Sequence, residues 1–485
     1  MLRPHFDALP QEDCSHQFEK YQKSGPRDSG LGAGEVDVRH FIRHSAFGIY
    51  DWLVICSLIR RDGMHLPKRH RIITGVVLAF ILVAIGLALA QDQETLRLRT
   101  AVAAEDPVFP EYLARLLGNP LSHGDAVVVH TNGDAAFPAM LAAIASAKHR
   151  ISFETYVYDA SGIASQFSNA FEAAARRGVA VRMVLDSVGA KDMNSGERQR
   201  MEQAGVKIGW YNALASYSIE EANYRTHRKI LVIDGEVAFI GGMGIGEHWW
   251  HDTKAFRRWR DTMMELRGPV ALNVDAGFNE NWIETGGVVD PDLTPHANDR
   301  PGRAQSVVVW SSPQGGANEM KLLYLMAIAA ARRTIDLQSP YLITDESSKW
   351  SLGEARKRGV RIRLLVEGDI TDAKPVKFAS RADYGELMAA GIEIYEYQPS
   401  MMHAKALVVD GVLSIFGSAN FDNRSLELND ELNAAVFDRE VAARIEADFD
   451  RDTKQSKRLD PNEWRSRPPH IRAREWAWSY FGEIF

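Results

Sequence analysis

Cysteine is nearly absent from this chain of 485 residues. The only two, Cys14 and Cys56, lie among the first sixty residues, so the sequence offers neither a disulfide framework nor a cysteine-rich metal site. A basic excess is missing as well, because 57 Lys and Arg residues stand against 64 Asp and Glu residues, for a net charge of −7. Nucleic-acid-binding proteins usually carry a basic footprint, so we expect no nucleic-acid partner.

Long hydrophobic runs are also scarce. Residues 72–90 form the only run of nineteen residues without a charge, which is just long enough to cross a bilayer as a helix. Three basic residues, Lys68, Arg69 and Arg71, precede it, and a polar and acidic stretch follows. By the positive-inside rule, the N-terminal side stays in the cytoplasm and the chain from about residue 91 faces the periplasm or exterior.

The apolar run has two other interpretations. Residues 64–90 also match a cleaved signal peptide, with a basic start, an apolar centre and Ala88-Leu89-Ala90 as the cleavage site. A buried core helix is the third alternative. We favour one retained N-terminal transmembrane helix within residues 64–95, preceded by a poorly ordered extension over residues 1–63.

Outside this segment the composition is that of a globular protein, with 45% hydrophobic and 25% charged residues. From about residue 120 the chain repeats itself once. Residues 173–186 match residues 354–369: in each, an amphipathic helix ends at Arg-Gly and a Val- and Ile-rich strand follows. Helices alternating with strands predict an α/β fold of two similar lobes, 120–290 and 305–455, each with a mostly parallel mixed sheet flanked by helices, before an aromatic tail over 456–485.

One motif, H-x-K-x4-D-G, occurs once in each half, and the two copies stand 176 residues apart (227 to 403). Its residues are our candidate catalytic residues: His227, Lys229 and Asp234, then His403, Lys405 and Asp410. On a strand, residues i and i+2 point to the same face, so each copy places an imidazole beside an ammonium group. The aspartates have the opposite parity and sit in an Asp-Gly turn, which favours a structural role for them over a catalytic one.

Two imidazoles and two ammonium groups in one cleft suit phosphoryl transfer. One neutral histidine can attack phosphorus, the other can protonate the leaving alkoxide, and the lysines can neutralise the phosphate oxygens. A lysine beside each histidine would repel a cation, so we expect no metal and no cofactor.

Further candidates follow each motif. Small residues that let a phosphate approach the backbone come after the turns, namely Gly242, Gly244, Ser418 and Asn420, although they also suit a tight turn. Asp261 and Glu431 occupy comparable places downstream and are candidates for orienting the histidines. For Trp249 and Trp250, we favour ordinary packing over a role in lining an acyl groove.

With these motifs, residues 120–455 resemble the phospholipase D superfamily, and more closely its bacterial cardiolipin synthase branch. The specific pieces, besides the two motifs, are 153–159, 396–405 and 417–425 with 428–431. The resemblance implies one metal-independent active site between two lobes. It also implies His227 and His403 as nucleophile and general acid, with His227 favoured as nucleophile, Lys229 and Lys405 as phosphate clamps, and Ser418 and Asn420 as phosphate-binding residues.

The resemblance implies a reaction in which two phosphatidylglycerol molecules give cardiolipin and glycerol through a phosphohistidine. The expected partners are therefore a phospholipid, phosphatidylglycerol, and a membrane; the expected location is the bacterial inner membrane, with the catalytic region on its periplasmic or outer side. Hydrolysis to phosphatidic acid, a nuclease and an inactive lipid-binding module are the alternatives. The first-half cradle departs from the family pattern, because Gly242 and Gly244 replace its serine and asparagine. The tail from Glu475 to Phe481 suits either a bilayer interface or core packing.

Overall fold

The computed structural model describes residues 95–212, 224–289, 299–312 and 319–480. The predicted N-terminal extension and the predicted membrane segment, residues 1–63 and 64–95, lie outside these ranges except for the last residue. Within the described ranges, no helix combines the length and the apolar character that a bilayer-spanning segment needs.

Two sets of seven strands follow one topology, as the internal repeat predicts. In spatial order the first lobe contains β4 (Lys207–Tyr211), β3 (Ala180–Asp186), β2 (Arg150–Thr155), β5 (Ile230–Ile233), β6 (Val237–Gly241), β7 (Thr262–Arg267) and β1 (Leu121–Thr131). The second contains β11 (Glu393–Tyr397), β10 (Arg361–Glu367), β9 (Thr334–Gln338), β12 (Ala406–Val409), β13 (Leu413–Gly417), β14 (Glu431–Phe437) and β8 (Ala304–Ser311). β1 pairs with β8, which joins both sets into one sheet, and β15 (Ser456–Arg458) extends its edge beyond β11.

The sheets are mixed, but the prediction that they are mostly parallel is wrong. Among the described strands of each lobe, only two of six pairings are parallel: β2–β3 and β3–β4 in the first, β9–β10 and β10–β11 in the second. The reason lies in the hairpins β5–β6 and β12–β13, each closed by an Asp-Gly turn. Only three residues separate the strands of each hairpin, so the chain must reverse, whereas a parallel pair needs a long crossover.

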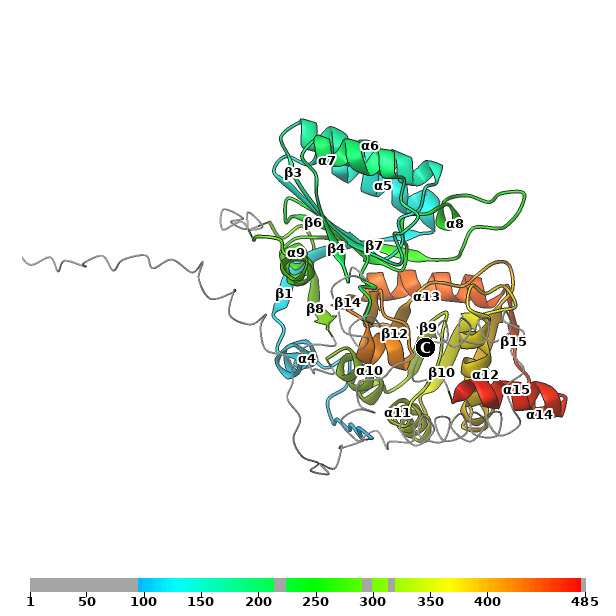
Figure 1. The fold of residues 1–485 in the computed structure, drawn as a ribbon. Helices are drawn as coiled ribbons and strands as arrows, with labels where there is room; N and C mark the ends of the chain where they lie inside the picture. The colour runs from blue at the N-terminus through cyan, green and yellow to red at the C-terminus, as the bar shows by residue number, and fades with distance from the viewer. Residues whose placement is uncertain (1–94, 213–223, 290–298, 313–318, 481–485) are drawn as a thin grey trace, which may run out of the picture. The chain divides into compact units, whose positions relative to one another are not determined.

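Helices cover the outer face of each set of strands. In the first lobe these are α5 (Gly133–Ser146), α6 (Gly162–Arg176) and α7 (Ser195–Gln203), which lie together over one face of the strands in Figure 1. Their counterparts are α10 (Glu319–Ala330), α11 (Glu346–Lys357) and α12 (Lys374–Ala389). Two further helices, α9 (Val270–Glu284) and α13 (Arg439–Thr453), contribute to a core that both lobes share, where Phe278 and Ile445 are buried with Ile240 and Phe416.

The equivalent helices α6 and α11 end as predicted. Each stops after an arginine, at Gly178 with φ +91° and at Gly359 with φ +88°. A residue with a side chain is strained at such angles, so glycine ends the helix and the chain enters β3 or β10. Their N-termini are capped by Ser161 and Asp345, whose side chains accept backbone N–H groups.

Short helices complete the chain: α4 (Phe109–Leu117), α8 (Glu247–Trp250), the π-helix η4 (Arg424–Leu428), α14 (Pro461–Arg465) and α15 (Pro469–Ser479). The tail helix α15 packs on α12 through buried Glu475, which accepts hydrogen bonds from Arg381 and Arg467. Its other face exposes Trp476 and Tyr480, 61% and 57% accessible. One side of the tail is therefore packed, and bilayer contact by the other side stays a prediction.

Candidate active site

His227 lies just before β5, in a segment that pairs with the second lobe. Its backbone N–H donates to the carbonyl of Asp430 at 2.9 Å, and the Asp430 N–H donates to the carbonyl of Arg225 at 3.0 Å. This pairing brings the next residue, Glu431, beside the imidazole, where its Oε1 lies 2.9 Å from His227 Nδ1. Glu431 is fully buried. The first histidine is therefore oriented by a carboxylate of the second lobe.

His403 repeats this arrangement with the lobes exchanged. Its backbone N–H donates to the carbonyl of Arg260 at 2.7 Å, and the Arg260 N–H donates to the carbonyl of Met401 at 2.8 Å. The fully buried carboxylate of Asp261 then lies 2.7 Å from His403 Nδ1. Both carboxylates were predicted to orient histidines, and the structure shows that each one serves the histidine of the opposite lobe. Neither half can form its histidine–carboxylate pair alone.

The two lysines are buried beside the histidines. Lys229 Nζ donates to the carbonyl of His227 and Lys405 Nζ to that of His403, each at 2.6 Å. Lys405 Nζ also lies 3.1 Å from His403 Nδ1. The histidine and lysine of each motif precede β5 and β12 rather than lying inside them, so an extended segment before each strand holds the predicted pair of side chains.

Burial and neighbouring charges set the protonation states. Burial, assisted by the charge of Lys229, lowers the pKa of His227 to about 4, while the His227 and Lys229 charges hold that of Glu431 at about 2 against the opposing effect of burial. His227 is therefore neutral at pH 7. An ionised carboxylate only accepts hydrogen bonds, so Nδ1 carries the hydrogen and Nε2 keeps a free lone pair. Burial lowers the pKa of His403 as well, and Lys405 adds to this effect.

The lysines have unusually low pKa values for the same reasons. Burial lowers the pKa of Lys229 to about 7 and that of Lys405 to about 8. The charge of Lys405 also lowers the pKa values of Lys229 and His227, which belong to the other lobe. The two half-sites thus share one electrostatic environment, which favours an anion between the lysines.

Asp234 and Asp410 were included among the candidate catalytic residues, and the structure places them elsewhere. They stand at the far ends of β5 and β12 from the histidines, with φ values of +54° and +52°. The carboxylate of Asp234 accepts the backbone N–H groups of residues 148–150 at 2.8–2.9 Å, and that of Asp410 accepts those of residues 332–334 at 2.7–2.8 Å. They stabilise the start of β2 and β9, so the structural role applies.

The four small residues predicted to bind phosphate differ between the halves. Ser418 Oγ accepts the Leu432 N–H at 2.9 Å, and the buried Oδ1 of Asn420 has no hydrogen-bond partner among the described residues. A side chain on Gly242 would place its Cβ 2.3 Å from Asp261 Oδ1, and one on Gly244 would place it 2.7 Å from Val157 Cβ. At each glycine the direction that a side chain would take is therefore filled by protein atoms, and phosphate binding at Gly242 and Gly244 stays a prediction.

Comparison with known proteins agrees with this geometry. Residues 140–282 and 324–453 match a family model described as cardiolipin synthase, PLD-like domain. The chain is 33% identical over 365 residues to the cardiolipin synthase of Geobacillus kaustophilus (strain HTA426), covering 74% of this chain and 72% of that protein. It is 30% identical over 382 residues to cardiolipin synthase 1 of Bacillus anthracis, covering 77% and 75%. The chain belongs to the cardiolipin synthase family of phospholipase D-like proteins.

A solved structure supports the fold of this family member. The crystal structure of phosphatidylserine synthase from Haemophilus influenzae Rd KW20 matches with a TM-score of 0.60 at 12% identity, covering 78% of this chain and 100% of that one. That identity supports the fold alone. The family model and the curated relatives confirm the resemblance to the phospholipase D superfamily. In the described part of the chain, no three His, Cys, Asp or Glu side chains are grouped so as to hold a metal ion.

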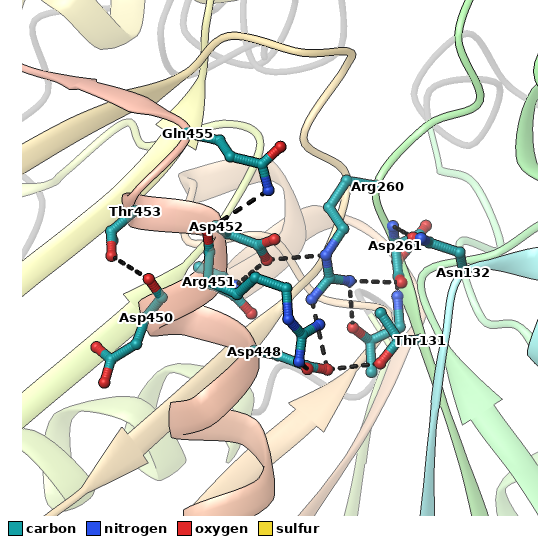
Figure 2. Close-up of polar contacts among 12 residues, drawn as sticks. Thr131, Asn132, Arg260, Asp261, Asp448, Asp450, Arg451, Asp452, Thr453 and Gln455 are labelled. Atoms are coloured by element: carbon teal, nitrogen blue, oxygen red, sulfur yellow. Dashed lines mark hydrogen bonds and ion pairs between the residues drawn. The ribbon is translucent and has the colours of Figure 1, made fainter.

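Arg260 connects the two lobes of this family member beside the second histidine, a role that we did not predict. Figure 2 shows its guanidinium between α13 and the segment that carries Asp261. Nε donates to Asp452 at 2.8 Å and Nη2 lies 3.7 Å from Asp448, while Nη1 donates to the carbonyl of Asp261 at 2.6 Å and to Thr262 at 2.9 Å. The only sign in the sequence is a pair of aspartates one helical turn apart.

Replacing Arg260 with methionine is expected to lower the free energy of unfolding by about 3–5 kcal/mol, because the buried carboxylate of Asp452 loses the guanidinium that pairs with it, whereas Asp448 keeps Arg444 and Arg451. Guanidinium denaturation of the full chain would measure this. Arg267→Met is the matched control, since the Arg267–Glu265 pair is half-exposed and such pairs contribute about 0–1 kcal/mol. Equal losses in the two variants would show that Arg260 does not hold the lobes together.

Proposed function

We propose that this protein is a phosphatidyltransferase that converts two molecules of phosphatidylglycerol into cardiolipin and glycerol. The observation that carries the proposal is the crossed pair of histidines, each bonded to a buried carboxylate of the other lobe, with a lysine beside each. Membership of the cardiolipin synthase family supports the same reaction.

In the first step we assign the attack on phosphorus to His227. Its Nε2 forms a bond to phosphorus, the bond from phosphorus to the glycerol oxygen breaks, and the leaving alkoxide takes a proton from the imidazolium of His403. His227 suits attack because its imidazole is neutral, and its side chain is 16% exposed against 8% for His403. The phosphodiester anion raises the pKa of His403 and so supplies the protonated acid.

The second step reverses these roles. His403, now neutral, takes the proton from a hydroxyl of a second phosphatidylglycerol, and that oxygen bonds to phosphorus as the bond to His227 Nε2 breaks. Cardiolipin leaves, and both histidines return to their starting states. Lys229 and Lys405 neutralise the non-bridging oxygens through both transition states.

The direct test uses purified full-length protein in micelles with phosphatidylglycerol as the only phospholipid. Cardiolipin and free glycerol in equal amounts would establish the transferase. Phosphatidic acid and glycerol without cardiolipin would mean that water resolves the phosphohistidine and that the protein is a hydrolytic phospholipase D.

The lysine pKa values predict how the reaction depends on pH. The free protein binds the anionic phosphodiester best with both lysines protonated, and their pKa values are lowered to about 7 and 8. We expect kcat/KM to fall on the acid side near pH 4 as His227 gains a proton. On the alkaline side we expect a first fall as His403, whose pKa is lowered by burial, loses the proton that it donates, and a second fall above pH 7–8 as the lysines lose theirs.

A pH profile of kcat/KM with and without Lys229→Arg would check this. Arginine stays charged throughout the range, so the second alkaline fall should move to higher pH in the variant while the fall due to His403 remains. A second alkaline fall at the same pH in both proteins would exclude Lys229 as its source.

We also propose that the protein is attached to the bacterial inner membrane, with its catalytic region on the periplasmic or outer side. The support is the apolar segment 72–90 with its basic N-terminal flank. External protease should digest the region after residue 91 in spheroplasts but not in intact cells. If this region were fully protected in spheroplasts in which a periplasmic control protein is digested, the proposed orientation would be reversed.

A further inference from the structure

The two half-sites use the same plan but differ in what holds the carboxylate. In the second lobe Glu431 accepts a hydrogen bond from Asn429 Nδ2 at 3.4 Å, and Ser418 also lowers the pKa of its carboxyl. The equivalent position in the first lobe is Gly242, which has no side chain to offer Asp261. Asp261 is nevertheless fully buried, and its pKa is lowered by the charge of His403 and by hydrogen bonds despite its burial. Besides His403 and the Thr262 N–H, one further donor contacts this carboxylate.

That donor is Trp249 in α8. Its indole Nε1–H donates to Asp261 Oδ2 at 2.9 Å, the same oxygen that faces His403 Nδ1 at 2.7 Å. The other oxygen, Oδ1, accepts the Thr262 N–H at 2.7 Å. The indole ring also packs edge-on against the His403 imidazole, with ring centroids 5.6 Å apart. Trp249 thus contacts both members of the histidine–carboxylate pair.

The glycines of the first lobe make room for this arrangement. A Cβ on Gly242 would lie 2.3 Å and 2.7 Å from the two oxygens of Asp261. A Cβ on Gly244 would lie 3.3 Å from Trp249 Cη2, besides its closer contact with Val157. We therefore relate the two glycines to the buried tryptophan. Gly242 and Gly244 stand where the family pattern has serine and asparagine, and the indole N–H of Trp249 reaches Asp261 from α8 instead.

We infer that Trp249 is a positioning residue that holds Asp261 and, through it, keeps His403 in the orientation needed to donate and accept the proton of the transferred group. The indole N–H is a donor without an acceptor role and does not titrate, so it stabilises the ionised carboxylate at every working pH. This inference rests on the proposed function, since it gives His403 the role of general acid.

Trp249→Phe tests the inference, because phenylalanine keeps a ring in the site and removes only the N–H donor and part of the indole. We expect kcat with phosphatidylglycerol to fall roughly 10- to 100-fold with little change in KM. A p-nitrophenyl ester of phosphatidic acid needs no proton donor for its leaving group. With that substrate the first-turnover burst of p-nitrophenol should stay within a few-fold of the unmodified protein.

Two further variants sharpen the test. Gly242→Ala places a methyl group against Asp261 and should show the same dependence on the leaving group. Trp250→Phe is the matched control, since Trp250 lies on the same helix and packs against Phe137 and His251 rather than Asp261, and it should show no such dependence. Equal losses with both substrates in Trp249→Phe would overturn the inference and leave a packing role only.

The measurements distinguish a failure of this inference from a failure of the proposed function. The p-nitrophenol burst needs only the first half of the reaction, so it reports on Trp249 even if water, rather than lipid, is the acceptor. Proton NMR gives a reading without any turnover: the His403 Nδ1–H signal, shifted downfield by Asp261, should broaden in Trp249→Phe. An unchanged signal would contradict the positioning role.

Discussion

Replacing His227 with alanine is expected to abolish phosphatidyl transfer, with turnover reduced by roughly 10⁴-fold or more. The imidazole supplies the atom that bonds to phosphorus, and no other described group offers a neutral lone pair held by an ionised carboxylate at that place. His227 is neutral at pH 7 because burial lowers its pKa to about 4, and Glu431 accepts its Nδ1–H. Removing the ring removes the nucleophile and leaves the lysines and His403 in place.

The decisive measurement follows the covalent intermediate. Unmodified protein quenched during turnover of labelled phosphatidylglycerol should carry an acid-labile phosphatidyl group, and His227→Ala should carry none, even with the p-nitrophenyl substrate. His130→Ala is the matched control, because His130 forms a similar partly buried pair with Glu265, at 2.9 Å, outside the site. A labelled His227→Ala protein would mean that His403 is the nucleophile.

The internal repeat allowed much of the fold to be predicted. Helix ends at Gly178 and Gly359 are local events, decided by a glycine at a left-handed angle, so they are visible in a short stretch of sequence. Strand direction is different, because an apolar run looks the same in a parallel and an antiparallel pair. The Asp-Gly turns at Asp234 and Asp410 held the missing information, since each one reverses the chain into a hairpin.

The candidate site likewise contains pairs that local sequence predicts and pairs that only the contact between lobes decides. Each histidine stands two residues before its lysine, at His227 and Lys229 and again at His403 and Lys405. The proximity within each pair therefore follows from local geometry. The carboxylates pair with the histidines across 204 and 142 residues, and only the contact between lobes decides which carboxylate serves which histidine. A sequence pattern can propose both acids without indicating that they cross.

Trp249 and Arg260 show why some functional residues escape such reasoning. A tryptophan near a motif is most often core, and ours is buried, yet its N–H meets Asp261 twelve residues further along the chain. Arg260 stands next to Asp261 but acts on α13, about 190 residues away in sequence (192 to Asp452). Both roles depend on where another element places its polar atoms, which no local spacing records.

Replacing His403 with alanine is expected to produce a defect of a different kind from that of His227→Ala. Loss of a general acid costs roughly 10²–10⁴-fold when the leaving group is the poorly acidic alkoxide of glycerol. With the p-nitrophenyl substrate the leaving group departs without a proton, so the first-turnover burst should return close to that of the unmodified protein.

The second step of the reaction provides the most specific test of this prediction. His403 also removes the proton from the attacking hydroxyl, and without it the phosphatidyl group should remain on His227 after the burst. His403→Ala should therefore accumulate the labelled intermediate, whereas His227→Ala should form none. The two variants thus differ in whether the protein carries the phosphatidyl group. A burst as slow as the phosphatidylglycerol reaction would show that His403 does more than transfer a proton in the first step, and the acid role assigned from its bond to Asp261 would be wrong.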